Sequence, residues 1–260
     1  MDFQTKMDKT VPLAKKAGEI IMGYLNKEKQ VEYKGDIDLV TAADKQSEKY
    51  LFENLEKLFP EDGIEAEEGH TKKSQSGYTW VVDPLDGTTS FAHNFPMFAV
   101  SIGLVDKNRN PVLGIVYNPF YKELFSAYKD GGAFLNGNPI SVSKTDSADK
   151  ALVGTGFPYT RRSHMDEILN RLGKILHVVH DIRRTGSASI DLSFVACGRL
   201  DAYYEAGLKP WDVAAGIIIV SEAGGVCTTF NKGPIDIDVQ ETFVSNGKFH
   251  DELSKIIQPI

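Results

Sequence analysis

The feature that most constrains this chain is an apolar strand that runs directly into an acidic, glycine-containing turn. Trp80-Val81-Val82 has the composition of a buried strand, and Asp83-Pro84-Leu85-Asp86-Gly87-Thr88-Thr89-Ser90 follows it at once. Because Pro84 restricts the backbone and lacks an N–H donor, two carboxylates leave the strand in a stiff turn. Carboxylates and an exposed carbonyl suit Mg²⁺, and the N–H groups after Asp86 suit an anion. The alternative is an Asx-type turn with threonine caps.

The segments around this turn alternate between helical and extended patterns. Apolar residues recur at helical spacing in 6–26 and 41–59, where Thr41 is a candidate N-cap and Pro60 ends the run. Four β-rich runs predict an antiparallel sheet: 79–82, 98–105, 111–117 and 123–128. Further strands are expected at 151–155, 178–182, 202–205, 226–229 and 243–245, and helices at 164–173, 187–197, 211–223 and 248–257. The alternation predicts an α/β fold with helices covering the sheets.

A polar stretch at 143–150 predicts a boundary within this fold. We expect an α+β N-terminal half, 1–146, and an α/β C-terminal half, 147–260, packed as one compact unit. A length of 260 residues suits either one large domain or two small ones.

Charge and composition disfavour several classes of function. The 36 acidic and 29 basic residues give a formal net charge of −7, which argues against binding to nucleic acid or anionic membranes. The longest apolar run, 213–220, is far shorter than the ~20 residues of a membrane span, and the charged N-terminus is unlike a signal peptide. Cys197 and Cys227 lie in apolar surroundings, which predicts buried free thiols. These features predict a soluble, cytoplasmic protein.

Three further acidic segments lie at the ends of expected elements, where α/β proteins build active sites. They are Glu65-Ala66-Glu67-Glu68-Gly69, the segment 38–44, and Lys209-Pro210-Trp211-Asp212. Each also has a simpler interpretation, as a solvated loop or as capping and dipole partners at the start of a helix. The six histidines lack zinc-binding spacing, and no nucleophile elbow, Walker loop or dinucleotide motif is present. The chemistry is therefore expected from carboxylates, hydroxyls and bound metal.

The segment after the apolar strand and the segment around Asp212 resemble the two signatures of the inositol monophosphatase family. The first spans 80–91, and the second is Trp211-Asp212-Val213-Ala214-Ala215-Gly216 followed by Glu222-Ala223-Gly224-Gly225. Segments 38–44, Glu67-Glu68 and 201–205 resemble other family motifs, so the resemblance covers nearly the whole chain. It implies a layered α-β-α-β-α sandwich, usually a homodimer, and a Mg²⁺-dependent, lithium-sensitive phosphatase.

The resemblance also implies roles for single residues. Two to three Mg²⁺ ions would be held, mostly by the N-terminal half, through Glu67, Asp83, the Leu85 carbonyl, Asp86 and Asp212. The catalytic group would be Glu67, Asp44 and Thr88, in which Asp44 accepts a hydrogen bond from the Thr88 hydroxyl that orients the attacking water.

The substrate-binding residues implied by the resemblance fall into two groups. The backbone amides of Gly87 and Thr88 would bind the phosphate. The alcohol half would face Asp86, Gly186, Ser187, Ala188, Glu205 and Asp212. Glu205 is the most informative of these, because a carboxylate accepts hydrogen bonds from polyol hydroxyls.

The implied reaction is hydrolysis of inositol-1-phosphate, a small phosphorylated polyol, by water and without a covalent intermediate. The same family fold also hydrolyses histidinol phosphate, fructose 1,6-bisphosphate, NADP and 3′-phosphoadenosine phosphate, and a shared fold does not discriminate among them. A different class of function is regulatory, since some bacterial relatives contact the transcription machinery. The basic pairs Arg161-Arg162 and Arg183-Arg184 are the candidates for that contact, although a solvated face explains each pair more simply.

Overall fold

The computed structural model describes residues 1–25, 27, 31–33 and 39–258. Within them are seven α-helices: α1 (Phe3–Met22), α2 (Ala42–Leu58), α3 (Thr88–Ala92), α4 (Met165–Leu176), α5 (Ala188–Ala196), α6 (Pro210–Glu222) and α7 (His250–Ile257). Two short 3₁₀ helices, η1 (Ala148–Lys150) and η2 (Arg161–Ser163), precede β11 and α4 respectively.

The described strands form a two-stranded ribbon and two larger sheets. The ribbon pairs β1 (Val31–Tyr33) with β2 (Leu39–Thr41). An eight-stranded sheet has the order β10-β9-β8-β7-β6-β5-β3-β4, built from β3 (Gly63–Ala66), β4 (Thr71–Lys72), β5 (Thr79–Asp86), β6 (Ala99–Val105), β7 (Pro111–Asn118), β8 (Glu123–Tyr128), β9 (Gly132–Leu135) and β10 (Asn138–Pro139). A five-stranded sheet has the order β12-β11-β13-β15-β14, built from β11 (Leu152–Thr155), β12 (Asp181–Arg183), β13 (Ala202–Ala206), β14 (Val226–Thr228) and β15 (Glu241–Ser245).

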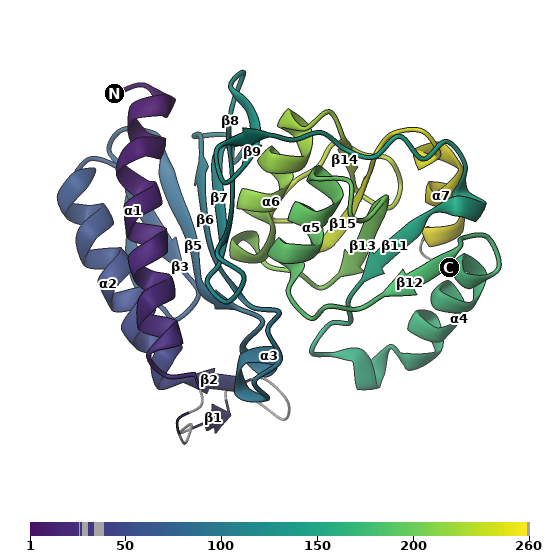
Figure 1. Cartoon of the computed structure of the whole chain (residues 1–260), viewed down its shortest axis with the longest axis horizontal. Helices are drawn as coiled ribbons and strands as arrows, with labels where there is room; N and C mark the ends of the chain where they lie inside the picture. The colour runs from purple at the N-terminus through teal and green to yellow at the C-terminus, as the bar shows by residue number, and fades with distance from the viewer. Residues whose placement is uncertain (26, 28–30, 34–38, 259–260) are drawn as a thin grey trace.

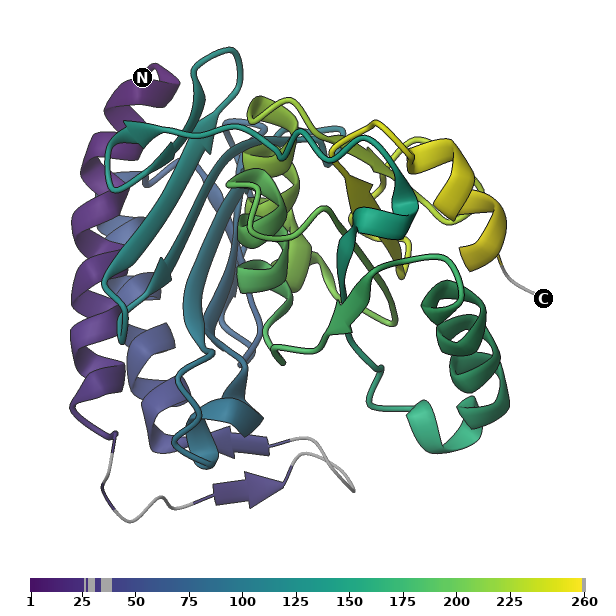
Figure 2. The same ribbon diagram turned by 45° about the vertical axis from the view of Figure 1, so that its right-hand side comes forward.

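These elements stack in five layers, which confirms the expected α-β-α-β-α arrangement. Helices α1 and α2 cover the outer face of the eight-stranded sheet, and α5 and α6 lie between the two sheets (Figure 1). Helices α4 and α7 cover the far side of the five-stranded sheet, as the turned view also shows (Figure 2).

Helix α6 is apolar on every side because it is packed between the sheets. All eight residues from Val213 to Val220 are buried, as expected of a helix without a solvent-facing stripe. Gly114 on β7 permits the close approach, since a Cβ there would lie 2.4 Å from the carbonyl oxygen of Ala215. This packing fixes where the N-terminal end of α6, with Asp212, meets the end of β5.

Several sequence-based expectations need correction. The first helix begins at Phe3, where the Asp2 carboxylate accepts the N–H of Thr5 at 2.8 Å, and it ends at Met22 instead of 26. The strand expected at 178–182 was misplaced, because α4 runs on to Leu176 and β12 begins only at Asp181. Strand β3 pairs in parallel with β5, so the first sheet is mixed and not purely antiparallel.

Two smaller expectations also differ from the structure. The very short elements β4, β9, β10 and α3 were not anticipated, since runs of two to five residues carry little periodic signal. Cys197 and Cys227 are free thiols, as expected, but each is only partly buried. Among the described residues, no helix is long and apolar enough to cross a membrane.

Candidate active site

A cleft of about 670 Å³ lies where the end of β5 meets the N-terminal ends of α5 and α6. It gathers almost every residue that the sequence singled out: Glu67, Asp83, Leu85, Asp86, Gly87, Thr88, Gly186, Ser187, Ala188, Glu205 and Asp212. Asp44 does not line the cleft but contacts Thr88 from behind. Asp38, in the first upstream motif, is outside the described residues.

The turn after β5 requires glycine at position 87. Gly87 has a φ of +86°, and a Cβ there would lie 2.7 Å from the carbonyl oxygen of Met97. The Asp83 carboxylate accepts the backbone N–H of Leu85 at 2.9 Å, at a register shift within β5. The turn expected directly after Val82 is therefore wrong, because β5 continues irregularly to Asp86. The backbone thus presents Asp83, Asp86 and Thr88 together at the edge of the sheet.

Six carboxylates line this cleft, and four of them, Glu67, Asp83, Asp86 and Asp212, are the expected metal ligands. Burial, and then the charges of Glu67, Asp86 and Asp212, raise the pKa of Asp83 well above its usual value. Burial, and then the charge of Asp86, raise the pKa of Asp212 well above its usual value. Burial also raises the pKa of Asp86. Carboxylates that are buried together in this way need protons or cations to neutralise them.

This charge distribution fits a divalent cation site. The donors are hard oxygen ligands, which Mg²⁺ prefers, and a hydrogen bond with the Glu67 side chain further raises the pKa of Asp83. Within the described part of the chain, no three His, Cys, Asp or Glu side chains are arranged closely enough to hold a metal ion as they stand. The fit therefore rests on the chemistry and charge of the donors.

Asp86 is held by the first turn of α5. Its Oδ2 accepts hydrogen bonds from the Ser187 hydroxyl at 2.6 Å, the Ser189 hydroxyl at 2.5 Å and the Ser189 backbone N–H at 2.8 Å. The Ser187 hydroxyl therefore donates a hydrogen bond to Asp86. The resemblance assigns Ser187 only to contact with the alcohol half of the substrate. Ser189 was missed from the sequence, where it shows only as a polar residue in the first turn of an apolar helix.

Thr88 and Asp44 form the hydrogen bond that the family resemblance implies. The Thr88 hydroxyl lies 3.0 Å from Asp44 Oδ1 and 3.0 Å from the Leu85 carbonyl oxygen. Asp44 Oδ2 accepts the backbone N–H of Thr41 at 2.8 Å and its hydroxyl at 2.5 Å, completing a capping box at the start of α2. The helix-capping interpretation and the pairing with Thr88 are therefore both correct, one for each carboxylate oxygen.

Glu205 lies on β13 of the five-stranded sheet and lines the cleft. The Tyr203 hydroxyl donates a hydrogen bond to Glu205 Oε2. Burial raises the pKa of Glu205 to about 7, while the bond from Tyr203 and the positive charge of Arg184 act in the opposite direction. The carboxyl group can therefore exchange hydrogen bonds with hydroxyl groups near neutral pH.

The loop that carries Glu67 is anchored by a buried residue that sequence reasoning missed. Glu48 on α2 accepts the backbone N–H of Glu68 at 2.6 Å and that of His70 at 3.2 Å, and its Oε1 lies 2.8 Å from His70 Nδ1. On the sequence Glu48 is one polar residue of an amphipathic helix, and nothing local distinguishes it.

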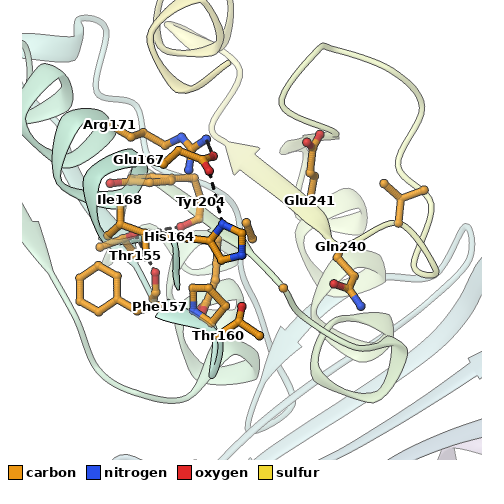
Figure 3. Close-up of a pocket in the computed structure, with 16 residues that line it drawn as sticks. Thr155, Phe157, Thr160, His164, Glu167, Ile168, Arg171, Tyr204, Gln240 and Glu241 are labelled. Atoms are coloured by element: carbon orange, nitrogen blue, oxygen red, sulfur yellow. Dashed lines mark hydrogen bonds and ion pairs between the residues drawn. The ribbon is translucent and has the colours of Figure 1, made fainter. Parts of the chain in front are cut away.

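A second cavity of about 410 Å³ adjoins the cleft and shares a wall with it, formed by residues 156–158 and Glu205. Its charged side chains largely satisfy one another: Arg171 donates to Glu167 at 2.7 Å, and His164 Nδ1 lies 3.9 Å from the same carboxylate (Figure 3). Arg171 also donates to the carbonyl oxygen of Ile257 at 2.9 Å. These contacts tie α4 to α7 and indicate a structural role for this cluster.

The chain matches known proteins over its whole length. The model of the inositol monophosphatase family matches residues 4–260. The "Inositol-1-monophosphatase" of Synechocystis is 44% identical over 258 residues, covering 98% of this chain and 90% of that protein. The "Nus factor SuhB" of Escherichia coli is 41% identical over 226 residues, covering 86% and 84% respectively.

A solved structure agrees with both the fold and the sequence match. The inositol monophosphatase from Anabaena superposes with a TM-score of 0.90 at 40% identity, covering 100% of this chain and 99% of that one. Together with the five-layer fold and the acidic cleft, these matches identify the chain as a phosphatase of the inositol monophosphatase family.

Proposed function

We propose that this protein is a Mg²⁺-dependent phosphomonoesterase that hydrolyses inositol-1-phosphate to inositol and phosphate. The observation that supports it most directly is the cleft itself, in which four acidic side chains face a buried carboxyl, Glu205, on the other sheet. One side suits metal ions and phosphate, and the other suits the hydroxyls of a polyol.

The proposed metal ligands are Glu67, Asp83, Asp86, Asp212 and the Leu85 carbonyl, for two to three Mg²⁺ ions. When bound, Mg²⁺ supplies charge neutralisation of the phosphate oxygens and lowers the pKa of water. The side chains supply a preorganised site. The three hydrogen bonds to Asp86 Oδ2 fix the orientation of that carboxylate, so no reorganisation of it is needed during turnover.

The proposed proton route uses Thr88 and Asp44. Because Asp44 Oδ1 lies 3.0 Å from the Thr88 hydroxyl, it accepts a hydrogen bond from that hydroxyl, and the Thr88 oxygen is left to accept a hydrogen bond from the attacking water. Glu67, which also lines the cleft, completes the catalytic group. The backbone N–H groups of Gly87 and Thr88 are the proposed donors to the phosphate.

The alcohol half is proposed to contact Glu205, Gly186, Ala188, Ser187, Asp86 and Asp212. Glu205 carries most of the specificity in this scheme, because the Tyr203 hydroxyl donates to Oε2 only and a substrate hydroxyl would donate to the other oxygen of this buried carboxyl. Histidinol phosphate, fructose 1,6-bisphosphate, NADP and 3′-phosphoadenosine phosphate are the alternative substrates for the same chemistry.

A panel assay tests the proposal. Phosphate release is measured from inositol-1-phosphate and from each alternative substrate, with Mg²⁺ and after chelation by EDTA, and with Li⁺ added to test for inhibition. We expect inositol-1-phosphate to be hydrolysed with the highest kcat/KM and chelation to abolish turnover. A higher kcat/KM for another substrate would replace inositol-1-phosphate, and turnover unaffected by EDTA would refute the metal.

A regulatory role is a second candidate, because the relative from Escherichia coli is named a Nus factor. We propose that it would coexist with phosphatase activity in the cytoplasm. Co-purification of the chain with RNA polymerase, compared between the wild type and Asp83→Asn, tests it: retention by both forms would separate the contact from catalysis, and no retention by either would reject it.

We also propose that the protein is a homodimer. Met165, Leu169 and Leu176 are exposed along one face of α4, at the spacing of a helix-packing seam. Light scattering of the wild type and of Leu169→Lys measures the oligomeric state directly.

A further inference from the structure

Three buried polar side chains on one face of α2 contact segments of the active site. Asp44, Ser47 and Glu48 are spaced at i, i+3 and i+4, so they lie on the same side of the helix, and all three are fully buried. The first two contact the start of α3 and the irregular part of β5. Glu48 instead reaches the separate loop that carries Glu67.

Both oxygens of the Glu48 carboxylate are hydrogen-bonded to this loop. Oε2 accepts the backbone N–H of Glu68 at 2.6 Å. Oε1 accepts the backbone N–H of His70 at 3.2 Å and lies 2.8 Å from Nδ1 of the same residue. A buried carboxylate is costly unless hydrogen bonds satisfy it, and here groups from a single loop satisfy both oxygens.

The backbone of Glu67 is held from two sides. Its own N–H donates to the carbonyl oxygen of Val82 at 3.1 Å, and the next N–H along the chain, that of Glu68, donates to Glu48. Val82 immediately precedes Asp83 on β5. The first bond therefore fixes the loop against the strand that carries Asp83, and the second fixes it against α2.

The position of Glu67 depends on this support. Strand β3 ends at Ala66, so Glu67 lies just beyond the residues whose backbone is fixed by pairing of β3 with β5. Glu67 and Asp83 can share a cation only if the loop and the strand keep a fixed separation. A metal ligand on a loop needs hydrogen-bonded partners behind it, since otherwise the loop must be ordered when the cation binds.

We infer that Glu48 is a positioning residue that sets the Mg²⁺ affinity of the cleft by holding the backbone of Glu67, an inference that rests on the proposed phosphatase function. Glu48 does not line the cleft and acts through the N–H of Glu68. Because the loop is held before a cation binds, binding orders little of the chain. A role confined to stability would lower the free energy of unfolding and leave the Mg²⁺ affinity of the folded protein unchanged.

The variant Glu48→Gln tests this inference at nearly constant side-chain size. An amide has one acceptor oxygen, so either the N–H of Glu68 or the two groups of His70 would lose their acceptor. Mg²⁺ binding is measured by calorimetry without substrate, and phosphate release from inositol-1-phosphate is measured over a range of Mg²⁺ concentrations. Glu53→Gln is the matched control, because it makes the same change on the exposed side of the same helix.

We expect Glu48→Gln to weaken Mg²⁺ binding about 10- to 100-fold, the usual effect of removing a partner behind a metal ligand. At saturating Mg²⁺ its kcat should stay within about threefold of the wild type, because every side chain that lines the cleft is unchanged. Glu53→Gln should match the wild type in both measurements. His70→Ala removes one of the three contacts and should weaken Mg²⁺ binding about two- to tenfold. It carries the test if Glu48→Gln does not fold.

Three results would overturn the inference. The first is an unchanged Mg²⁺ affinity in the folded variant, which would leave Glu48 a role in stability alone. The second is a fall in kcat that saturating Mg²⁺ does not restore, which would place its effect on another step. The third is an equal loss of affinity in Glu53→Gln, which would assign the effect to overall charge.

Failure of the wild type to bind Mg²⁺, or to hydrolyse any member of the substrate panel, would instead reject the proposed function. That failure is distinguishable from failure of the inference, in which the wild type binds Mg²⁺ and the variant binds it equally well. Urea unfolding of each variant checks that it is folded under the conditions of the titration.

Discussion

The two oxygens of Asp44 offer the sharpest separation between folding and catalysis in this protein. Oδ2 serves the capping box of α2 through Thr41, and Oδ1 accepts the Thr88 hydroxyl. We therefore consider three substitutions: Thr41→Val, which removes only the capping hydroxyl; Thr88→Val, which removes only the other partner; and Asp44→Asn, which disturbs both.

The contacts of each residue decide which general magnitude applies. Losing a helix cap costs about 0.5–2 kcal/mol of stability, so Thr41→Val should lower the free energy of unfolding by that amount and leave turnover within about threefold. Thr88→Val should instead lower kcat by about 10²–10⁴-fold, equivalent to about 2.7–5.4 kcal/mol of transition-state stabilisation. Asp44→Asn should show both effects.

Two assays measure these effects: urea unfolding followed by circular dichroism, and phosphate release at saturating substrate. Mg²⁺ titration by calorimetry serves as the control, because none of the three residues is a proposed metal ligand and the affinity should change little. In the double variant of Asp44 and Thr88, kcat should be little lower than in either single variant, since residues that act as one unit are not additive.

The reasoning would be wrong if the two single losses multiplied in the double variant, because Asp44 and Thr88 would then act independently. It would also be wrong if Thr41→Val reduced kcat as much as Thr88→Val. That result would make the start of α2 as a whole, and not the Oδ1 contact, the feature on which turnover depends.

Three further predictions follow from the site and its surroundings. Asp83→Asn should abolish activity and weaken Mg²⁺ binding, because it removes a charge surrounded by the other proposed ligands; normal Mg²⁺ titration with normal turnover would contradict this. Glu205→Gln should lower kcat/KM on inositol-1-phosphate by an amount equivalent to about 1–3 kcal/mol of transition-state stabilisation, and by less on an aryl phosphate. Equal losses on both substrates would show that Glu205 does not contact the alcohol. Burial lowers the pKa of His250 from 6.5 to about 4, so the unfolded chain binds this proton at higher pH than the folded one. The free energy of unfolding should therefore be highest above about pH 6.5 and lower by about 2 kcal/mol at pH 5, where His250 is protonated mainly in the unfolded chain. Urea unfolding of the wild type and of His250→Asn at several pH values measures this difference. Identical pH profiles of the two proteins would refute it.

Local sequence determined the elements that depend on short-range chemistry. The run Trp80-Val81-Val82 forms part of a buried strand because β-branched and aromatic side chains pack well on a covered sheet, and the turn at Gly87 follows because only glycine adopts that backbone without strain. Thr41 caps α2 as its position before an apolar periodic run predicts. These features involve neighbours within a few residues, which a linear pattern displays.

Local sequence failed where an element's limits depend on what packs against it. The pattern placed a strand at 178–182, but α4 continues to Leu176 and β12 pairs with β11 only from Asp181. The partner strand decides the register, and no propensity within the segment records that partner.

The site itself needed the tertiary structure. Thr88 meets Asp44 across 44 residues, and Ser189 meets Asp86 across 103, because helices α2 and α5 pack on opposite faces of the sheet that contains β5. The family resemblance named most of the cleft residues, and their catalytic roles stay predictions. Ser189 and Glu48 carry no local signal, since a polar residue in the sequence has the same appearance whether it contacts water or a partner inside the protein. Their partners depend on how the two sheets pack against α5 and α6. That packing exists only in the folded molecule.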